Sequence, residues 1–235
     1  MTDEIDSSTA QMGEYWNDIL ADWESSAYQG GQTGRLVERV GSRFRGHIRD
    51  RAQSAFALIK DQVPGSTIIE IGCGSGEFCL ALAELQPSQV IGLDVSQEAI
   101  ELASAHAEQL GLLPERVRFV QALVGEDFPH PPAIDLVVGL GITEYVHLQD
   151  LKSFLNSVEP TYFLLSFDEK RLNLQKVVHK AYRLIKQLPY YYRFSQLEMR
   201  QTMTEMGFID VRTFRDGANA FVTNIPSAKT ATDVI

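Results

Sequence analysis

The spacing of apolar residues divides the chain at Pro64-Gly65. Before this dipeptide, apolar residues recur every three or four positions, which predicts a short helix around 15–23 and a long helix over 36–61. After it, short apolar runs alternate with helical segments, and this alternation predicts crossover units that build a parallel sheet. The pattern therefore separates an N-terminal helical part from an α/β part.

The α/β part contains seven predicted strands and five predicted helices. The strands are 67–71, 89–93, 117–121, 134–139, 161–167, 208–214 and 218–223. The helices are 76–85, 97–110, 150–157, 170–187 and 195–206. Arg215-Asp216-Gly217 separates the last two strands, and its Asp-Gly pair predicts a hairpin, so we expect these two strands to be antiparallel.

Size and charge narrow the classes of function. A chain of 235 residues suits one α/β domain with appendages, and its formal net charge of −10 disfavours nucleic acid as a partner. Basic residues nevertheless concentrate in two segments, with a balance of +4 in 35–51 and +6 in 169–200. No apolar run approaches the roughly 20 residues of a membrane span, and the first residues are acidic, so we expect no membrane association and a cytoplasmic location. The oligomeric state is left open.

Cys73 and Cys79 are the two cysteines of the sequence. Two residues of this type, six positions apart across a turn and the start of a helix, form neither a metal-binding pair nor a disulfide framework. We expect both to be small packing residues, and we expect no metal.

A glycine-rich turn follows the first predicted strand, in Glu70-Ile71-Gly72-Cys73-Gly74-Ser75-Gly76. Its glycines alternate, unlike the G-x-G-x-x-G of dinucleotide-binding turns, and a carboxylate at Glu70 would repel phosphate but suits an ammonium group. Asp94 ends the second predicted strand, where a carboxylate can accept both hydroxyls of a ribose. A cofactor with a ribose and a cationic amino-acid end fits both carboxylates, and S-adenosylmethionine is such a cofactor. The alternatives are tight packing alone or another nucleotide.

These motifs resemble those of class I S-adenosylmethionine-dependent methyltransferases, over roughly residues 66–140. The resemblance implies a Rossmann-like, seven-stranded, mostly parallel sheet with N-terminal helices and a helical lid between strands 5 and 6. It implies that Asp94 binds the ribose and that Val95 lies beside the adenine. The implied cofactor-binding residues are Glu70, Gly72, Cys73, Gly74, Asp94, Val95, Ala122, Leu123 and Leu140.

The same resemblance divides the chain into an N-terminal helical cap over 1–64 and a methyltransferase domain over 65–225. Within that domain, 168–200 is expected to be an insertion that covers the substrate, and 226–235 a flexible tail. One departure concerns the adenine: where the family often has an acidic residue after the third strand, this chain has Leu123. The backbone of Ala122 or Leu123, or the side chains of Glu126 or Asp127, are the alternatives there.

The segment Asp135–His147 covers the fourth predicted strand and the loop at its carboxyl end, where open α/β sheets place their chemistry. It lacks the Asn-Pro-Pro-Tyr or Asp-Pro-Pro-Tyr motif that resembles amino-group methylation of bases or glutamine. Methyl transfer to a hydroxyl needs alignment and a base. Tyr145, His147 and Glu144 are the candidate catalytic residues; alternatively, Tyr145 packs, Glu144 is solvated and His147 caps the following helix.

A narrower resemblance links the chain to magnesium-protoporphyrin O-methyltransferases and their uncharacterised bacterial relatives. The matching segments are Tyr15-Trp16, Arg43–Arg49, Leu140–Tyr145, Leu165–Phe167 and Pro189–Phe194. The tetrapyrrole enzymes have a histidine where Tyr145 falls, so their base and substrate do not transfer to this chain.

Both basic segments fall where this fold commonly covers the acceptor. Arg43, Arg45, Lys180 or Arg183 would attract an anionic acceptor, and the tyrosines Tyr190–Tyr192 would stack on a flat one. The expected substrate-binding residues are Tyr15, Trp16, Arg43, Arg45 and Tyr191. Alternatively, the basic side chains lie on helix faces exposed to solvent, and the aromatic rings only pack against the protein.

The sequence thus predicts methyl transfer from S-adenosylmethionine to oxygen, or to nitrogen, of a small anionic or aromatic metabolite. Two alternatives stay open. The first is methylation of a protein or of RNA, which the basic segment 169–200, with its balance of +6, still allows. The second is a cofactor-binding protein without turnover.

Overall fold

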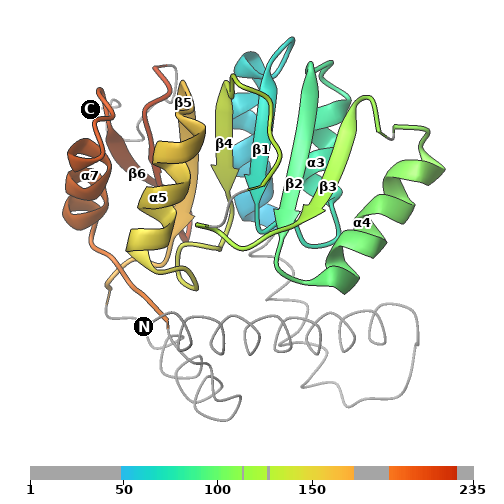
Figure 1. Cartoon of the computed structure of the whole chain (residues 1–235). Helices are drawn as coiled ribbons and strands as arrows, with labels where there is room; N and C mark the ends of the chain where they lie inside the picture. The colour runs from blue at the N-terminus through green and yellow to red at the C-terminus, as the bar shows by residue number, and fades with distance from the viewer. Residues whose placement is uncertain (1–48, 113, 126–127, 172–190, 227–235) are drawn as a thin grey trace.

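The computed structural model describes residues 49–112, 114–125, 128–171 and 191–226 (Figure 1). Seven strands form one sheet in the order β3-β2-β1-β4-β5-β7-β6. They are β1 (Thr67–Ile71), β2 (Gln89–Asp94), β3 (Val117–Gln121), β4 (Leu136–Gly139), β5 (Tyr162–Phe167), β6 (Arg212–Asp216) and β7 (Asn219–Thr223). The first five strands pair in parallel, and β7 pairs antiparallel with both β5 and β6. The predicted Rossmann-like, mostly parallel sheet with its antiparallel C-terminal pair is confirmed.

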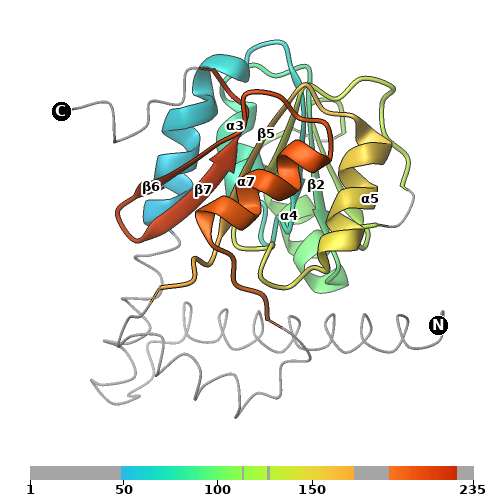
Figure 2. The same ribbon diagram turned by 90° about the vertical axis from the view of Figure 1, so that its left-hand side faces the viewer.

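Helices cover both faces of this sheet (Figures 1 and 2). The helix over 49–59, which continues into the 3-10 helix η1 (Lys60–Gln62), packs on one face together with α3 (Glu77–Ala83) and α4 (Gln97–Gln109). The helices α5 (Leu148–Val158) and α7 (Gln196–Glu205) pack on the other face. Each face of the sheet has its own hydrophobic core, because successive side chains of β1 point to opposite faces. Ile69 and Ile71 belong to the core on the α5 side, and Ile68 belongs to the core on the α3 side.

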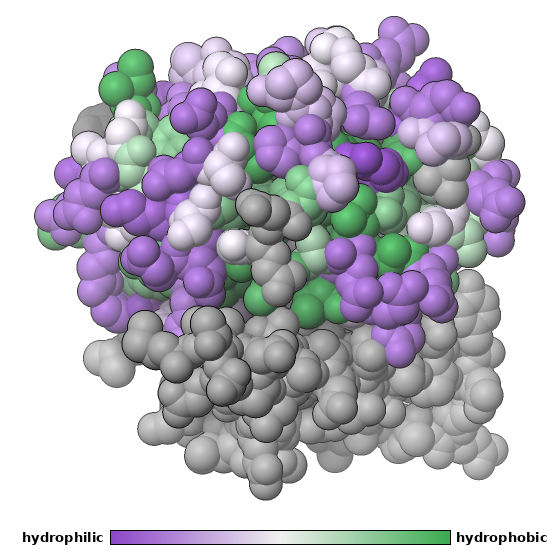
Figure 3. Space-filling model, viewed as in Figure 1, coloured by the Kyte–Doolittle hydropathy of each residue, from purple (hydrophilic) through white to green (hydrophobic). Residues whose placement is uncertain are grey.

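The connection between β3 and β4 contains no helix in its described parts, 122–125 and 128–135. It crosses the face that carries α5, and Val124 and Ile134 pack from it onto the core (Figure 1). In the space-filling view, hydrophobic side chains show in the middle of this face, between the hydrophilic surfaces of the neighbouring helices (Figure 3). An irregular segment therefore covers the front of the central strands. Within the described residues, no helix has the length and apolar character needed to cross a membrane.

Local signals explain where the helices begin. The Ser96 hydroxyl accepts a hydrogen bond from the backbone N–H of Ala99 and caps α4. Ser195 and Glu198 form a capping box at the start of α7. Gly76, with a φ of 80°, precedes α3 and lets the chain turn sharply out of the glycine-rich segment.

Two sequence predictions are wrong in detail. The strand predicted over 208–214 lies at Arg212–Asp216, because the apolar residues before it belong to the connection after α7. The Phe208 N–H donates to the Met203 carbonyl, and the Phe208 ring packs on Phe163 with ring centroids 4.6 Å apart. The hairpin loop is therefore Gly217-Ala218 rather than Arg215–Gly217, and Gly217 supplies the positive φ of 58° at its first position.

A helix was predicted over 170–187, but Lys170 and Arg171 are not helical: Glu169 forms a parallel bridge with Phe194, and the Lys170 N–H donates to the Phe194 carbonyl at 2.8 Å. The rest of that helix, the short helix over 15–23 and residues 36–48 lie outside the described residues.

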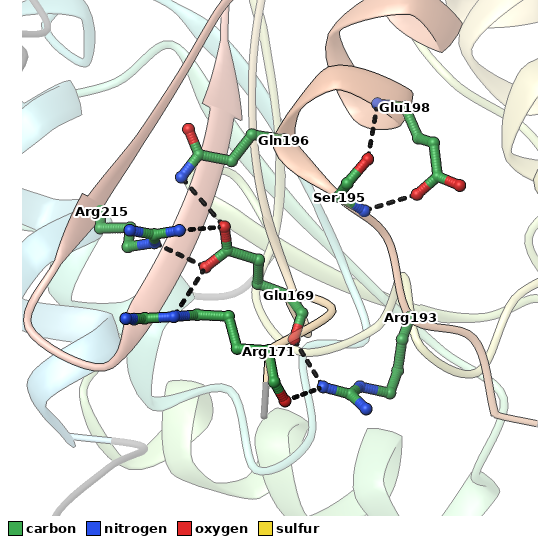
Figure 4. Close-up of polar contacts among 7 residues, drawn as sticks. All are labelled: Glu169, Arg171, Arg193, Ser195, Gln196, Glu198 and Arg215. Carbon is green, nitrogen blue, oxygen red and sulfur yellow. Dashed lines mark hydrogen bonds and ion pairs between the residues drawn. The ribbon is translucent and has the colours of Figure 1, made fainter. Parts of the chain in front are cut away.

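A polar cluster joins the chain after β5 to β6 and α7 (Figure 4). The Glu169 carboxylate accepts hydrogen bonds from both Nε and Nη2 of Arg215, from Gln196 at 3.1 Å, and lies 4.0 Å from Arg171. The Arg193 guanidinium donates to the carbonyls of Glu169 and Arg171 at 2.8 and 2.9 Å. Residues 169–171 and 193–196, which come from either side of the segment 172–190, are thereby fixed side by side.

Glu169 should make folding stability depend on acid pH. Hydrogen bonds from Arg215 lower the pKa of Glu169 in the folded protein below its ordinary 4.5. The carboxylate therefore stabilises the fold above pH 4.5, and this stabilisation is lost as the pH falls through the pKa of Glu169 in the folded protein. We expect Glu169→Gln to lower the free energy of unfolding by about 1–2 kcal/mol at pH 7, since Arg215 is 43% exposed and partly screened. Urea unfolding at pH 7 and pH 3 measures this, and the difference from wild type should shrink at pH 3. The matched control is Glu108→Gln, an exposed position on α4; an equal effect of both variants would contradict the assignment.

Candidate functional site

The carboxyl ends of β1, β2, β4 and β5 meet along one edge of the sheet (Figure 1). The chain runs from β1 to β2 and β3 on one side and returns to β4 and β5 on the other, so the strand order reverses between β1 and β4. Open α/β sheets bind ligands at such a reversal. The sequence-predicted site residues that the structure describes follow these four strands or lie beside them.

The glycine-rich turn after β1 is held against β2. The N–H groups of Gly72 and Cys73 both donate to the carbonyl of Leu93, at 2.8 and 2.9 Å. Gly72 and Gly74 have φ values of 71° and 51°, which side chains rarely adopt. A Cβ built on Gly74 would meet nothing within 4 Å, so open space lies beside this backbone. The turn can therefore admit a ligand close to its main chain.

Asp94 joins the turn to the start of the next helix. Its Oδ2 accepts a hydrogen bond from the Gly74 N–H at 2.9 Å, and its Oδ1 accepts one from the Ser96 N–H at 3.0 Å. Burial raises the pKa of Asp94, while these N–H groups act against the rise. Each carboxylate oxygen has two acceptor sites, so one remains on each after these bonds. The carboxylate can thus accept two further donors side by side.

Glu70 lies at the end of β1 and is buried beneath the turn. Burial raises its pKa to about 8, and the nearby Asp94 carboxylate adds to the rise. The Cys79 thiol donates to Glu70 Oε2 at 2.9 Å. Both cysteines are free and buried, as expected of packing residues, but Cys79 also serves as a hydrogen-bond donor.

The other predicted cofactor residues lie close by. The Ala122 N–H donates to the carbonyl of Asp94 at 3.0 Å, and Gln121 Nε2 donates to the carbonyl of Val95 at 3.1 Å. Leu123 follows Ala122 and is half-buried, and Leu140 follows β4 and packs partly into the core of the α3 face. Glu126 and Asp127 lie outside the described residues.

The Phe119 ring, from β3, packs against the glycines that support the turn. A Cβ on Gly92 in β2 would lie 2.6 and 2.7 Å from Phe119 Cδ1 and Cε1, and 3.0 Å from Cys73 Sγ. A Cβ on Gly76 would lie 2.7 Å from Phe119 Cζ. Gly92 therefore makes room for this ring and for Cys73, and Gly76 makes room for the ring and for the Ala103 Cβ, which would lie 2.8 Å away.

We expect Gly92→Ala to destabilise the fold by about 1–3 kcal/mol, because the added methyl group overpacks against Phe119 and Cys73. Phe119→Leu should recover part of this loss when combined with Gly92→Ala, because it removes the ring that the methyl group meets. Urea unfolding of both single variants and the double variant measures the coupling. Strictly additive losses would show that Phe119 is not the obstacle.

The loop after β4 carries the predicted catalytic residues. Glu144 is 6% exposed, so it is buried rather than solvated, and the Thr143 hydroxyl lies 3.3 Å from its Oε2. Burial raises the pKa of Glu144, and the positive charge of Arg51 opposes the rise. Tyr145 packs edge-on against Tyr191, with ring centroids 5.4 Å apart. His147 precedes α5, but its side chain makes no capping hydrogen bond and instead contacts Tyr192.

Tyr191 lies among the carboxylates of this region. Its hydroxyl donates to Asp168 Oδ2 at 2.9 Å, and Arg193 Nε lies 3.2 Å from the same oxygen. Burial raises the pKa of Tyr191, and Glu144 and Asp168 add to the rise. The other predicted substrate residues, Tyr15, Trp16, Arg43 and Arg45, lie outside the described residues, as do Lys180 and Arg183.

Two residues at this edge were not predicted. The guanidinium of Arg51, on the helix before β1, lies against Gly141: a Cβ there would be 2.5 Å from both Nη1 and Nη2. Arg51 Nε is buried and has no hydrogen-bond partner within the described part of the chain. Asp168 directly follows β5. Asp94 was predicted because it is an acidic residue at the carboxyl end of a strand. The same criterion would also have identified Asp168.

Comparisons with known proteins find relatives of the part of the chain that carries this site. Residues 68–160 match the family described as "Methyltransferase domain". The chain is 33% identical over 129 residues to a ubiquinone biosynthesis O-methyltransferase of Methylobacterium sp. (strain 4-46), covering 52% of this chain and 48% of that protein. It is 28% identical over 109 residues to a ribosomal protein L11 methyltransferase of Deinococcus radiodurans, covering 46% and 40%. The chain thus spans about half the length, or less, of these curated relatives.

Solved structures show the same fold. Magnesium protoporphyrin IX methyltransferase from Synechocystis PCC 6803 with bound SAH superposes with a TM-score of 0.64 at 18% identity, over 91% of this chain and 97% of that one. The same enzyme with bound SAM gives a TM-score of 0.63 at 16% identity, over 92% and 95%. At this level of identity the likeness concerns the fold.

Proposed function

This chain belongs to the class I S-adenosylmethionine-dependent methyltransferases, and from that premise we propose that it methylates an oxygen, or a nitrogen, of a small anionic or aromatic acceptor. The observation that carries the proposal is the pairing of a glycine turn open to a ligand with the Asp94 carboxylate beside it. A buried carboxyl, Glu144, lies across the strand-order reversal from that turn. Under this proposal, one edge of the sheet would hold both the methyl donor and the group that takes the proton.

The residues present fit S-adenosylmethionine. The open space beside Gly74 admits the methionine portion, and the two remaining acceptor sites on Asp94 suit a ribose diol. Glu70 has no cation beside it in the described part of the chain, and an ammonium group would supply one. We assign the carboxylate of the methionine portion to Arg51, whose buried Nε lacks a partner among the described residues. Val95, Ala122, Leu123 and Leu140 would border the adenine.

When bound, S-adenosylmethionine supplies a methyl group on a positively charged sulfur, open to in-line displacement. Glu144 would accept the proton of the acceptor, since a buried carboxyl whose pKa is raised is a stronger base than an exposed one. The edge-on rings of Tyr145 and Tyr191 would position a flat acceptor. In the domain arrangement that we propose, 1–64 forms a cap and 168–200 a cover over the acceptor, on a core domain of 65–225 with a tail at 226–235.

A product screen tests the proposal. The protein is incubated with S-adenosylmethionine and single small acceptors, phenolic, carboxylic or amino, and formation of S-adenosylhomocysteine is followed. We expect turnover with at least one phenolic or carboxylic compound. Failure of both S-adenosylmethionine and S-adenosylhomocysteine to bind in calorimetry would overturn the proposal.

Protein methylation is the second candidate, because the chain is similar to a ribosomal protein L11 methyltransferase. Ribosomal protein fractions are therefore included as acceptors. Turnover with these alone would favour this candidate over the first.

A further inference from the structure

All three candidate catalytic residues of the loop after β4 contact the consecutive pair Tyr191-Tyr192. The Tyr192 N–H donates to the Glu144 carbonyl at 2.8 Å. The Tyr145 ring packs edge-on against Tyr191, and the Tyr192 hydroxyl contacts His147. Because the Tyr191 hydroxyl donates to Asp168, this pair is itself held at the end of β5. Tyr192 is thus fixed by its backbone beside the imidazole that its side chain contacts.

The oxygen of Tyr192 lies 2.5 Å from His147 Nδ1, with ring centroids 5.5 Å apart. A neutral imidazole has one N–H and one bare nitrogen, so this bond exists in one of two forms. Either the phenol donates to bare Nδ1, or Nδ1–H donates to the phenol oxygen. A phenol is acidic compared with an aliphatic hydroxyl and donates well to nitrogen. Burial raises the pKa of Tyr192, and Asp150 adds to the rise, so the phenol keeps the proton that it donates.

We infer that Tyr192 is a positioning residue that fixes His147 in the tautomer with its proton on Nε2. In this form Nδ1 is occupied by the phenol and Nε2 carries a hydrogen, so the neutral imidazole presents a donor and no free lone pair. His147 then acts as a hydrogen-bond donor and not as the base of the loop. Glu144 is left as the group of the loop that takes the proton, and this part of the inference rests on the proposed function.

Nitrogen-15 NMR of the protein labelled at its five histidines reads the tautomer directly, without cofactor or turnover. His147→Gln assigns the signal. We expect the neutral imidazole of wild-type His147 to be the Nε2–H form, and Tyr192→Phe to give a mixture of both tautomers. Tyr162→Phe, at the amino end of β5, is the matched control and should leave the signal unchanged.

A wild-type His147 protonated on Nδ1, or identical spectra for wild type and Tyr192→Phe, would overturn the inference. Tyr192→Phe keeps the ring and the backbone bond to Glu144, so a change in tautomer is separable from loss of structure, which thermal unfolding monitors. S-adenosylhomocysteine binding by the same samples reports on the proposed function. Loss of cofactor binding with an intact tautomer would contradict that function while leaving the role of Tyr192 in place.

Discussion

Asp94→Ala is expected to weaken S-adenosylhomocysteine binding by at least about 100-fold. The carboxylate has one acceptor site left on each oxygen, and two hydrogen bonds to a charged group contribute about 3–6 kcal/mol together. The substitution also removes the partner of the Gly74 N–H, which helps to hold the turn open. Isothermal titration calorimetry of wild type and variant, in one buffer and at one salt concentration, measures the ratio.

The controls separate binding from folding. Asp61→Ala changes the same residue type at an exposed position of η1 and should leave the affinity within threefold of wild type. Asp94→Asn keeps an oxygen acceptor but loses the charge, so its affinity should fall between those of wild type and Asp94→Ala. If Asp94→Ala binds as well as wild type while melting normally, the ribose assignment is wrong.

The sheet and the glycine-rich turn beside Asp94 could be predicted from sequence because both depend on local patterns. Apolar runs of strand length defined β1 to β5, and Asp94 stood out because it ends one of them. The alternating spacing of Gly72, Gly74 and Gly76 predicted the turn. Near α7 the same reasoning failed: Phe208, Ile209 and Val211 read as a strand, yet Phe208 packs on Phe163 and Ile209 is 77% exposed. Local apolar content does not distinguish a helix end from a strand.

The acceptor side of the site depends on contacts between distant segments. Glu144 is a charged residue in the loop after β4, and its residue type predicts exposure, yet it is buried. The charges that act on it come from Arg51, on the helix before β1, and from Asp168, after β5. Arg51 could be recognised as part of a basic segment, but its contact with Gly141 spans two elements far apart in sequence. The bond between Tyr192 and His147 joins residues 45 positions apart. Such pairings follow from topology, which single-residue spacing does not encode.

Glu144→Gln should lower kcat by about 100- to 1,000-fold, with the affinity for S-adenosylhomocysteine within threefold of wild type. A general base contributes on this scale, and glutamine keeps the size and polarity of the side chain without accepting a proton. Burial raises the pKa of Glu144 above its ordinary 4.5, so wild-type kcat should rise with pH as this carboxyl loses its proton. The variant should lose that limb of the pH profile. Rates are measured on the acceptor found in the product screen, at saturating S-adenosylmethionine.

Stability distinguishes a lost base from a damaged fold. A carboxyl whose pKa is raised in the folded state stabilises the protein in its protonated form and weakens it as pH rises above the ordinary value. Glutamine does not ionise, so it avoids the loss of stability that comes with a buried carboxylate. Glu144→Gln should therefore unfold at the same temperature as wild type at pH 7, or at a higher one. Glu205→Gln, exposed on α7, should change neither rate nor stability. A variant with unaltered kcat and an unaltered pH profile would assign the proton transfer to another group, and since Tyr192 occupies His147 Nδ1, the next candidate is Tyr145.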